Sequence, residues 1–318
     1  MEFSAQLLQC LITGVSTGLI ISLVALGYTM VYGIVELINF AHGDVMMLGA
    51  FLALTLIGLC GGEQASPWLA ITLALIVTPI FCASLNWTAE RVVYRPLRSA
   101  PKLTVLVSAI GVSFICVNLG MFWGGLPMDV FHGGTMAASS HSVPDLIDGS
   151  NLLGAGASVM LSHKDVLVVS VTVPLLIALT WVVQRTNLGR SMRAVAQDPT
   201  AARLMGIDVD RVIGNTFLIG GALAGVAGVV LALYNGQIGF GMGYRSGLDA
   251  FTAAVLGGIG SLPGAVLGGL VIGLVRAVME GLVANGGQWC NTVVFTVLIL
   301  VLVFRPTGLL GSRVREKV

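Results

Sequence analysis

Charged side chains are scarce in this chain of 318 residues. Asp, Glu, Lys and Arg make up 10% of it, against about a quarter of an ordinary soluble domain, and the mean hydropathy is +0.95. Each charge-free stretch approaches the roughly 20 residues that a helix needs to cross a bilayer. The eight stretches are 3–35, 45–62, 64–89, 103–128, 166–184, 212–244, 250–275 and 281–304. The pattern predicts an all-α polytopic membrane protein with about eight transmembrane helices, and it excludes an ordinary soluble domain.

Lysine, cysteine and histidine are also few, and their positions exclude several kinds of protein. None of the three lysines, Lys102, Lys164 and Lys317, follows a glycine, so the chain has no GxxxxGK[ST] loop for the phosphates of ATP. The five cysteines show neither CxxC nor Cys/His spacing, so we expect no disulfide framework and no metal site. No catalytic side chains pair at helical spacing, so we expect no enzyme and no cofactor. A net charge of +1 offers no basic surface for nucleic acid.

Thirteen of the sixteen Lys and Arg residues fall into three clusters. Because basic residues concentrate in cytoplasmic loops, the clusters and the C-terminus are predicted to face the cytoplasm. Residues 129–165 hold four aspartates and one lysine, as expected of a loop on the outer side. The clusters are Arg91, Arg95, Arg98 and Lys102; Arg185, Arg190, Arg193, Arg203 and Arg211; and Arg305, Arg313, Arg315 and Lys317.

Three charge-free stretches separate the second cluster from the third, so one of them must enter the membrane and return on the same side. The best candidate is 250–275, because its centre reads Gly257-Gly258-Ile259-Gly260-Ser261-Leu262-Pro263-Gly264, and glycine and proline break helices. We predict a re-entrant hairpin with a mid-membrane turn near Gly260–Pro263; an ordinary kinked helix is the alternative. A similar interruption lies at 39–44. Paired broken segments are typical of an inverted repeat around a central path, which we also predict.

The loop 185–211 contains a short helix by its end signals. Asp198 followed by Pro199 is typical of a helix start, and Gly206 of a helix end. Leu204 and Met205 are apolar, and burying them against another protein is more favourable than exposing them to water, which favours a docking helix for a cytoplasmic partner. A solvated loop helix is the alternative.

Several motifs along nearly the whole chain resemble one family. They are Asn39-Phe40-Ala41-His42-Gly43-Asp44, Arg95-Pro96-Leu97-Arg98, Leu204-Met205-Gly206-Ile207-Asp208, the glycine-rich block 257–264 and Arg305-Pro306-Thr307-Gly308. The chain is similar to the LivH-type permease subunits of branched-chain amino acid ABC importers; urea and amide permeases are close relatives of that family.

The resemblance implies one transmembrane permease domain over 1–318, in a bacterial inner membrane, with a periplasmic loop at 129–165 and a cytoplasmic coupling loop at 185–211. It also implies a second permease subunit, identical or homologous, two ATPase subunits that bind ATP, and a periplasmic substrate-binding protein. Residues that the resemblance and the docking helix assign to ATPase coupling are Arg193, Asp198, Ala202, Leu204, Met205 and Gly206.

A path for an amino acid needs a few hydrogen-bonding groups, little fixed charge and apolar walls. Candidates are Asn39, His42 and Asp44 at the first interruption, Ser108, Ser113 and Asn118 in the fourth stretch, and Gly260 and Ser261 at the second interruption. These residues could instead line only a gate. His42 could simply bond a backbone group, and Asp44 could cap the following helix. Arg245 and Asp249 are expected to pair at the outer surface.

Two other classes of protein remain as alternatives. An ion-coupled carrier needs buried charges at mid-membrane, and only Glu36 and Asp44 qualify. An intramembrane enzyme needs catalytic pairs within helices. Within the preferred class, a permease for urea or short amides stays open.

Overall fold

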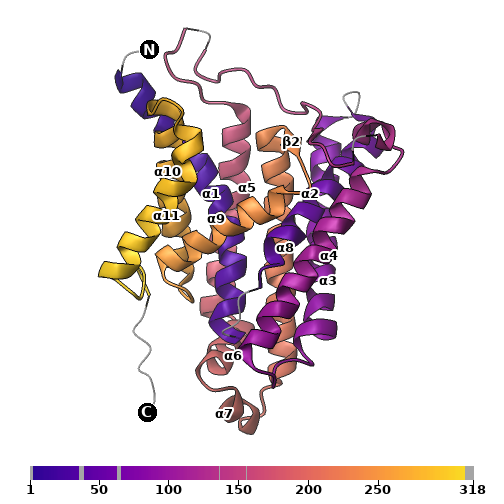
Figure 1. The fold of residues 1–318 in the computed structure, drawn as a ribbon, viewed down its shortest axis with the longest axis vertical. Helices are drawn as coiled ribbons and strands as arrows, with labels where there is room; N and C mark the ends of the chain where they lie inside the picture. The colour runs from indigo at the N-terminus through magenta and orange to yellow at the C-terminus, as the bar shows by residue number, and fades with distance from the viewer. Residues whose placement is uncertain (1–2, 36–38, 63–65, 136, 155, 312–318) are drawn as a thin grey trace.

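A computed structural model describes residues 3–35, 39–62, 66–135, 137–154 and 156–311 (Figure 1). Eight helices in these ranges are long and apolar enough to cross a membrane, which confirms the prediction of about eight membrane helices. They are α1 (Phe3–Val35), α2 (His42–Leu59), α3 (Pro67–Ala89) continued by the π-helical turn η2 (Glu90–Tyr94), α4 (Lys102–Gly124), α5 (His163–Arg185), α8 (Val209–Asn235), α10 (Leu262–Leu282) and α11 (Gly286–Phe304). Glu36 and the basic residues 313–317 lie outside the described ranges.

The two ends of the bundle differ. One end, here called the α7 end, carries two short helices, α6 (Asn187–Gln197) and α7 (Pro199–Leu204) (Figure 1). The other, here called the loop end, carries the connection from α4 to α5, with η3 (Asp129–Gly134) and β1 (His141–Ser142). Gln9 near the start of α1 exchanges hydrogen bonds with the backbone of Met160 in this connection, so α1 begins at the loop end. β1 pairs antiparallel with β2 (Gln237–Ile238), which follows α8.

Two helices begin inside the bundle instead of at one of its ends. The ring of His42, the first residue of α2, lies beside Gly27 in the second half of α1, where a Cβ would stand 2.1 Å from the His42 Nε2. The first turn of α9 (Met242–Gly257) meets that of α2, because a Cβ on Gly43 would stand 2.3 Å from the Gly243 carbonyl oxygen. The two helices then run apart. Gly58, late in α2, touches Val130 at the loop end, whereas α9 runs to the turn before α10.

Close helix pairs hold the bundle together, and they depend on glycine. α1 packs along α10, where a Cβ on Gly273 would lie 2.3 Å from the Gly18 nitrogen. α3 packs along α8, where a Cβ on Gly225 would lie 2.7 Å from the Pro79 Cα. In lipid, such close backbone approach supplies dispersion contacts in place of a hydrophobic driving force. α2 and α9 fill the space between these two pairs, packing on α8 and α1 respectively.

The stretch 250–275 is broken where the sequence predicts it. α9 ends at Gly257, and α10 begins at Leu262 after Ser261, whose hydroxyl accepts the Gly264 N–H at 3.2 Å. The depth differs from the prediction of a mid-membrane turn. Leu309 and Leu310 donate backbone hydrogen bonds to the last turn of α9, which places the turn beside the end of α11, a full-length candidate span. The break therefore lies near one end of the membrane-length helices. α9 starts inside the bundle, halfway along these helices, and its 16 residues extend from there to that end.

The pairing of interruptions also needs correction. The sequence matches 39–44 with 257–264. In the structure, the counterpart of 39–41 is 236–241. The first stretch leads into α2 and the second into α9, and both helices start inside the bundle. The charge-free run 212–244 hides this second interruption, because β2 and the turn after it contain no charged residue.

Candidate functional site

The first interruption forms a buried polar cluster. Asn39, which is 5% exposed, donates from Nδ2 to Asn86 Oδ1 at 3.3 Å and accepts from the Tyr94 hydroxyl at 2.8 Å. Asn86 donates in turn to the Phe217 carbonyl at 2.7 Å. The cluster thus ties the non-helical stretch before α2 to α3, η2 and α8, and it satisfies the polar groups that a broken helix leaves in an apolar interior.

His42 and Asp44 lie one turn further along and are both 1% exposed. The His42 ring stands edge-on to Tyr28, with 4.9 Å between ring centroids. Asp44 is not a helix cap: α2 starts earlier, at His42, and the Asp44 carboxylate instead accepts the Ser113 hydroxyl of α4. The sequence names Asp44 and Ser113 as path candidates in two separate segments, and it does not predict the contact between them.

The other path candidates lie apart from this cluster. Ser108 and Asn118 hydrogen-bond the backbone of their own helix, to Thr104 and Phe114, and Asn118 is exposed on the outward face of α4. Gly260 lines a small cavity of about 110 Å³ beside α6, and Ser261 caps the start of α10. The structure therefore brings together Asn39, His42 and Asp44 with Ser113, but neither Ser108 and Asn118 nor the α9–α10 turn joins them.

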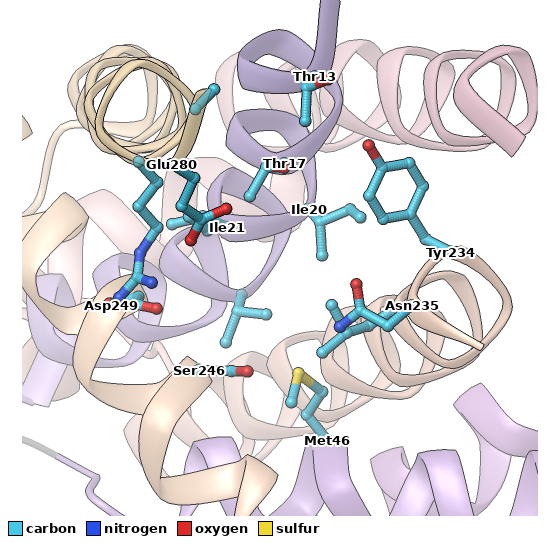
Figure 2. Close-up of a pocket in the computed structure, with 14 residues that line it drawn as sticks. Thr13, Thr17, Ile20, Ile21, Met46, Tyr234, Asn235, Ser246, Asp249 and Glu280 are labelled. Carbon is cyan, nitrogen blue, oxygen red and sulfur yellow. Dashed lines mark hydrogen bonds and ion pairs between the residues drawn. The ribbon is translucent and has the colours of Figure 1, made fainter. Parts of the chain in front are cut away.

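A larger cavity opens where the sequence predicts no site. It has a volume of about 290 Å³ and lies between α1, α8, α9 and α10, with Met46 of α2 at its base; we call it the α1–α10 cavity (Figure 2). Asp249 lies here and pairs with Arg276 at 2.6 Å, not with Arg245 as the sequence spacing predicts. Arg276 also donates to Asn291 at 2.8 Å. The sequence signal was present: Arg276 and Glu280 are the only charges between two apolar stretches, four residues apart on one face of α10.

The remaining lining of the cavity divides by chemistry. Hydroxyl and amide groups come from Thr13, Thr17, Tyr234, Asn235 and Ser246. Apolar side chains come from Ile20, Ile21, Val24, Met46 and Leu231.

The α7 end presents an exposed apolar surface. Asp198 caps α7 by accepting the N–H groups of Thr200 and Ala201 at 2.8 and 3.0 Å, as the sequence predicts. Gly206 leaves the helix at a φ of +84°, a conformation that favours glycine. Leu204 and Met205 are 84% and 82% exposed.

Two other predicted coupling residues hold α6 and α7 in place. Ala202 is buried, and the Arg193 guanidinium bonds the Val183 carbonyl. The sequence analysis does not predict α6, because the polar composition of this segment is typical of a loop.

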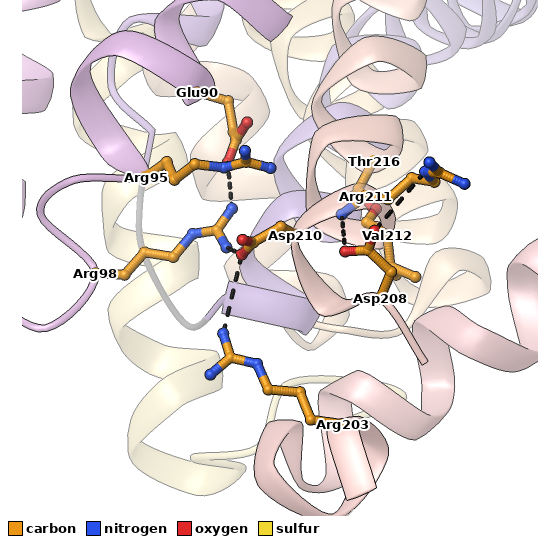
Figure 3. Close-up of polar contacts among 9 residues, drawn as sticks. All are labelled: Glu90, Arg95, Arg98, Arg203, Asp208, Asp210, Arg211, Val212 and Thr216. Atoms are coloured by element: carbon orange, nitrogen blue, oxygen red, sulfur yellow. Dashed lines mark hydrogen bonds and ion pairs between the residues drawn. The ribbon is translucent and has the colours of Figure 1, made fainter. Parts of the chain in front are cut away.

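A chain of ion pairs joins α7 to the bundle (Figure 3). Glu90, in the π-helical turn after α3, is 1% exposed and pairs with Arg98. Arg98 also pairs with Asp210 at the start of α8, and Asp210 lies 3.9 Å from Arg203 of α7. The sequence analysis uses these arginines as orientation signals and, for Arg98, as part of a family motif, and it does not predict this network.

The described residues contain no group of three or more His, Cys, Asp or Glu side chains that could hold a metal ion. Fold and sites together define a multi-pass helical membrane protein with a broken-helix interior. The sequence matches, over residues 10–303, the family described as branched-chain amino acid transport system / permease component, and the chain belongs to that family. Such a permease component is not itself a catalyst.

Curated relatives match the chain over almost its full length. It is 41% identical to the high-affinity branched-chain amino acid transport system permease protein BraD of Pseudomonas aeruginosa, over 98% of both chains. It is 38% identical to the permease protein LivH of the corresponding system of Escherichia coli strain K12, over 98% of this chain and 97% of the relative. A probable permease protein LivH of Methanocaldococcus jannaschii is 26% identical over 91% of this chain.

Proposed function

We propose that this chain forms the membrane path of a binding-protein-dependent ABC importer for branched-chain amino acids, and that separate ATPase subunits drive it from the α7 end. One observation carries the proposal: a capped helix projects two exposed apolar side chains, Leu204 and Met205, outside the bundle. Exposed apolar side chains on a rigid projecting helix are typical of a protein-docking surface. The chain lacks a phosphate-binding loop, so the energy for uphill transport comes from a partner.

The sidedness of the proposal follows from charge. Arg91, Arg95, Arg98 and the arginines of 185–211 gather toward the α7 end, and positive residues favour the cytoplasm. The C-terminus then also faces the cytoplasm of a bacterial inner membrane. The loop end faces the periplasm, where residues 129–162 would receive the substrate-binding protein.

An inverted repeat accounts for the helix order. α1, α2, α3 and α4 would correspond to α8, α9, α10 and α11, with α5 between the halves. Each half starts with a long helix, continues through a non-helical stretch into a helix that begins inside the bundle, and packs its third helix on the other half's first. The contact between Gly43 and Gly243 would lie on the symmetry axis. Such breaks are where transporters place their central path.

In this arrangement the cluster of Asn39, His42 and Asp44 lines the centre of the path, and Gly260 and Ser261 form its gate toward the ATPases. Ser108 and Asn118 line the path only if a second permease subunit covers the outward face of α4. That face is rich in exposed apolar side chains, among them Val107, Phe114 and Phe122, which suits either lipid or a homologous permease.

The docking proposal is tested by replacing Leu204 or Met205 with Glu in a co-expressed complex. A charge in an apolar docking site removes a central contact, so we expect the amount of ATPase subunit that co-purifies to fall roughly tenfold. Leu153→Glu is the matched control, because Leu153 is 56% exposed at the loop end. Unchanged assembly in both α7 variants would contradict the proposal. Uptake of a urea analogue but not of leucine by the parent complex would favour the amide permease.

A further inference from the structure

We propose that the α1–α10 cavity is a binding site within the permease itself for an α-amino acid in its zwitterionic form with a branched aliphatic side chain. The inference rests on the proposed transport function and names a site in addition to the binding protein. Three properties of the cavity carry it: its charges, its apolar wall and its position.

The charges of the cavity suit a zwitterion. Asp249 and Glu280 outnumber Arg276 among the charged residues that line the cavity, so the lining carries one excess negative charge. The carboxylate of Asp249 is already paired with Arg276, whereas Glu280 forms no ion pair with another described residue. Glu280 is exposed at the cavity, and an ammonium group there would form a charge-assisted hydrogen bond with it. Asp249 and Asn291 both accept from Nη2 of Arg276, which leaves its other N–H donors for a carboxylate.

The rest of the wall suits an aliphatic side chain. Ile20, Val24, Met46 and Leu231 bring methyl and thioether groups to one cavity without a charge among them. The volume of about 290 Å³ is at the small end of ligand pockets, which suits one small metabolite. Urea or a short amide offers no ammonium group to Glu280 and little aliphatic surface to the apolar wall, so the lining matches a branched-chain amino acid better.

The position of the cavity connects the loop end with the polar cluster. Its lining comes from the middle of α1 (residues 13–24), the end of α8, the first half of α9 and the second half of α10. Figure 2 shows Glu280 and Asp249 on one side and Tyr234 and Asn235 on the other. Met46 stands one turn after His42 on α2, so the base of the cavity adjoins the helix that carries the central polar residues. A ligand delivered at the loop end would meet this cavity before that cluster.

The test uses the full-length permease in lipid nanodiscs without binding protein, and measures the dissociation constants of leucine, leucinamide and 4-methylpentanoate by isothermal titration or scintillation proximity. We expect the parent to prefer leucine, since only leucine carries both charged groups. Glu280→Gln should weaken the affinity for leucine roughly tenfold or more, because a charge-assisted hydrogen bond is lost. It should not weaken the affinity for 4-methylpentanoate, because that ligand has no ammonium group and loses only repulsion from the Glu280 carboxylate. Glu280→Asp should restore part of the affinity. Asp145→Asn is the control and should leave the affinity for leucine unchanged, because the Asp145 side chain is 81% exposed and lies outside the cavity.

A second measurement separates this inference from the proposed function. The same variants are assayed for ATP-dependent leucine uptake in a complex with the ATPase subunits and binding protein. Uptake by the parent complex together with equal leucine affinity in the parent and Glu280→Gln permeases would overturn the site but leave the transport function standing. Absence of uptake by the parent complex would overturn the transport function. Correct folding of each variant is checked by its elution as a single species and by ATPase co-purification.

Discussion

Single residues decide how the α7 end is joined to the membrane bundle. Glu90 is the most enclosed member of the ion-pair network, and Arg98 connects it with Asp210. Removing one partner of a buried pair leaves an uncompensated charge, which costs far more than the pair contributes. The network also offers a rigid route by which movement of α7 would reach α3 and α8.

We therefore predict that Glu90→Gln lowers the free energy of unfolding by about 3 kcal/mol. This value is the low end of the range for broken buried pairs, because Arg98 still forms its ion pair with Asp210 in the variant. The measurement is thermal or chemical unfolding of the purified protein in one detergent. Arg211→Gln is the control, since that arginine and its partner Asp208 are 80% and 61% exposed and the pair contributes about 0–1 kcal/mol. Equal effects of the two substitutions would contradict the role of burial.

At the scale of helices, the bundle depends on pairs of helices whose backbones lie so close together that no side chain fits between them. Gly273 on α10 meets the backbone of α1 at Gly18 and at Gly14, where a Cβ would stand 2.3 and 2.4 Å from backbone atoms. Neither backbone can give way without shifting a whole helix. Gly111 on α4, in contrast, has open space around it.

Gly273→Ala should accordingly destabilise the protein by about 1–3 kcal/mol through overpacking. Gly111→Ala should be neutral or stabilise by up to about 1 kcal/mol, because alanine is the better helix former. Both are compared by apparent unfolding temperature. A Gly273 variant as stable as the Gly111 variant would mean that α1 and α10 are not in close contact.

The helices differ in how far the sequence could predict them. The charge-free stretches located seven of the eight candidate spans in the described residues, since lipid disfavours charge whatever the packing. The other span, α10, begins inside 250–275 and continues past Arg276 and Glu280 to Leu282. End signals located α7, because capping by Asp198 and Gly206 is local chemistry. α6 and α9 were missed, since one is polar and the other starts inside an uninterrupted apolar run. The α1–α10 cavity was missed because Arg276 meets Asp249 only after two distant helices pack.

For the whole molecule, α9 determines the topology. α8 ends at the loop end beside β1, and α9 returns the chain to the level of the end of α11 before α10 crosses back. Residues 236–257 therefore add one crossing to the eight candidate spans, and the number of crossings becomes odd. An odd number would place the start of α1 and the end of α11 on opposite faces of the membrane.

Accessibility of single cysteines tests this topology in inverted and right-side-out vesicles. In a background without the five native cysteines, Ser4→Cys and Ala138→Cys should react with an impermeant maleimide only from the periplasmic side. Thr200→Cys on α7 and Pro306→Cys after α11 should react only from the cytoplasmic side, because positive residues hold that end inside. Retained leucine uptake confirms that each variant is folded. Labelling of Ser4→Cys and Pro306→Cys from one and the same side would require an even number of crossings, and neither the inverted repeat nor the entry of α9 from the loop end could then stand.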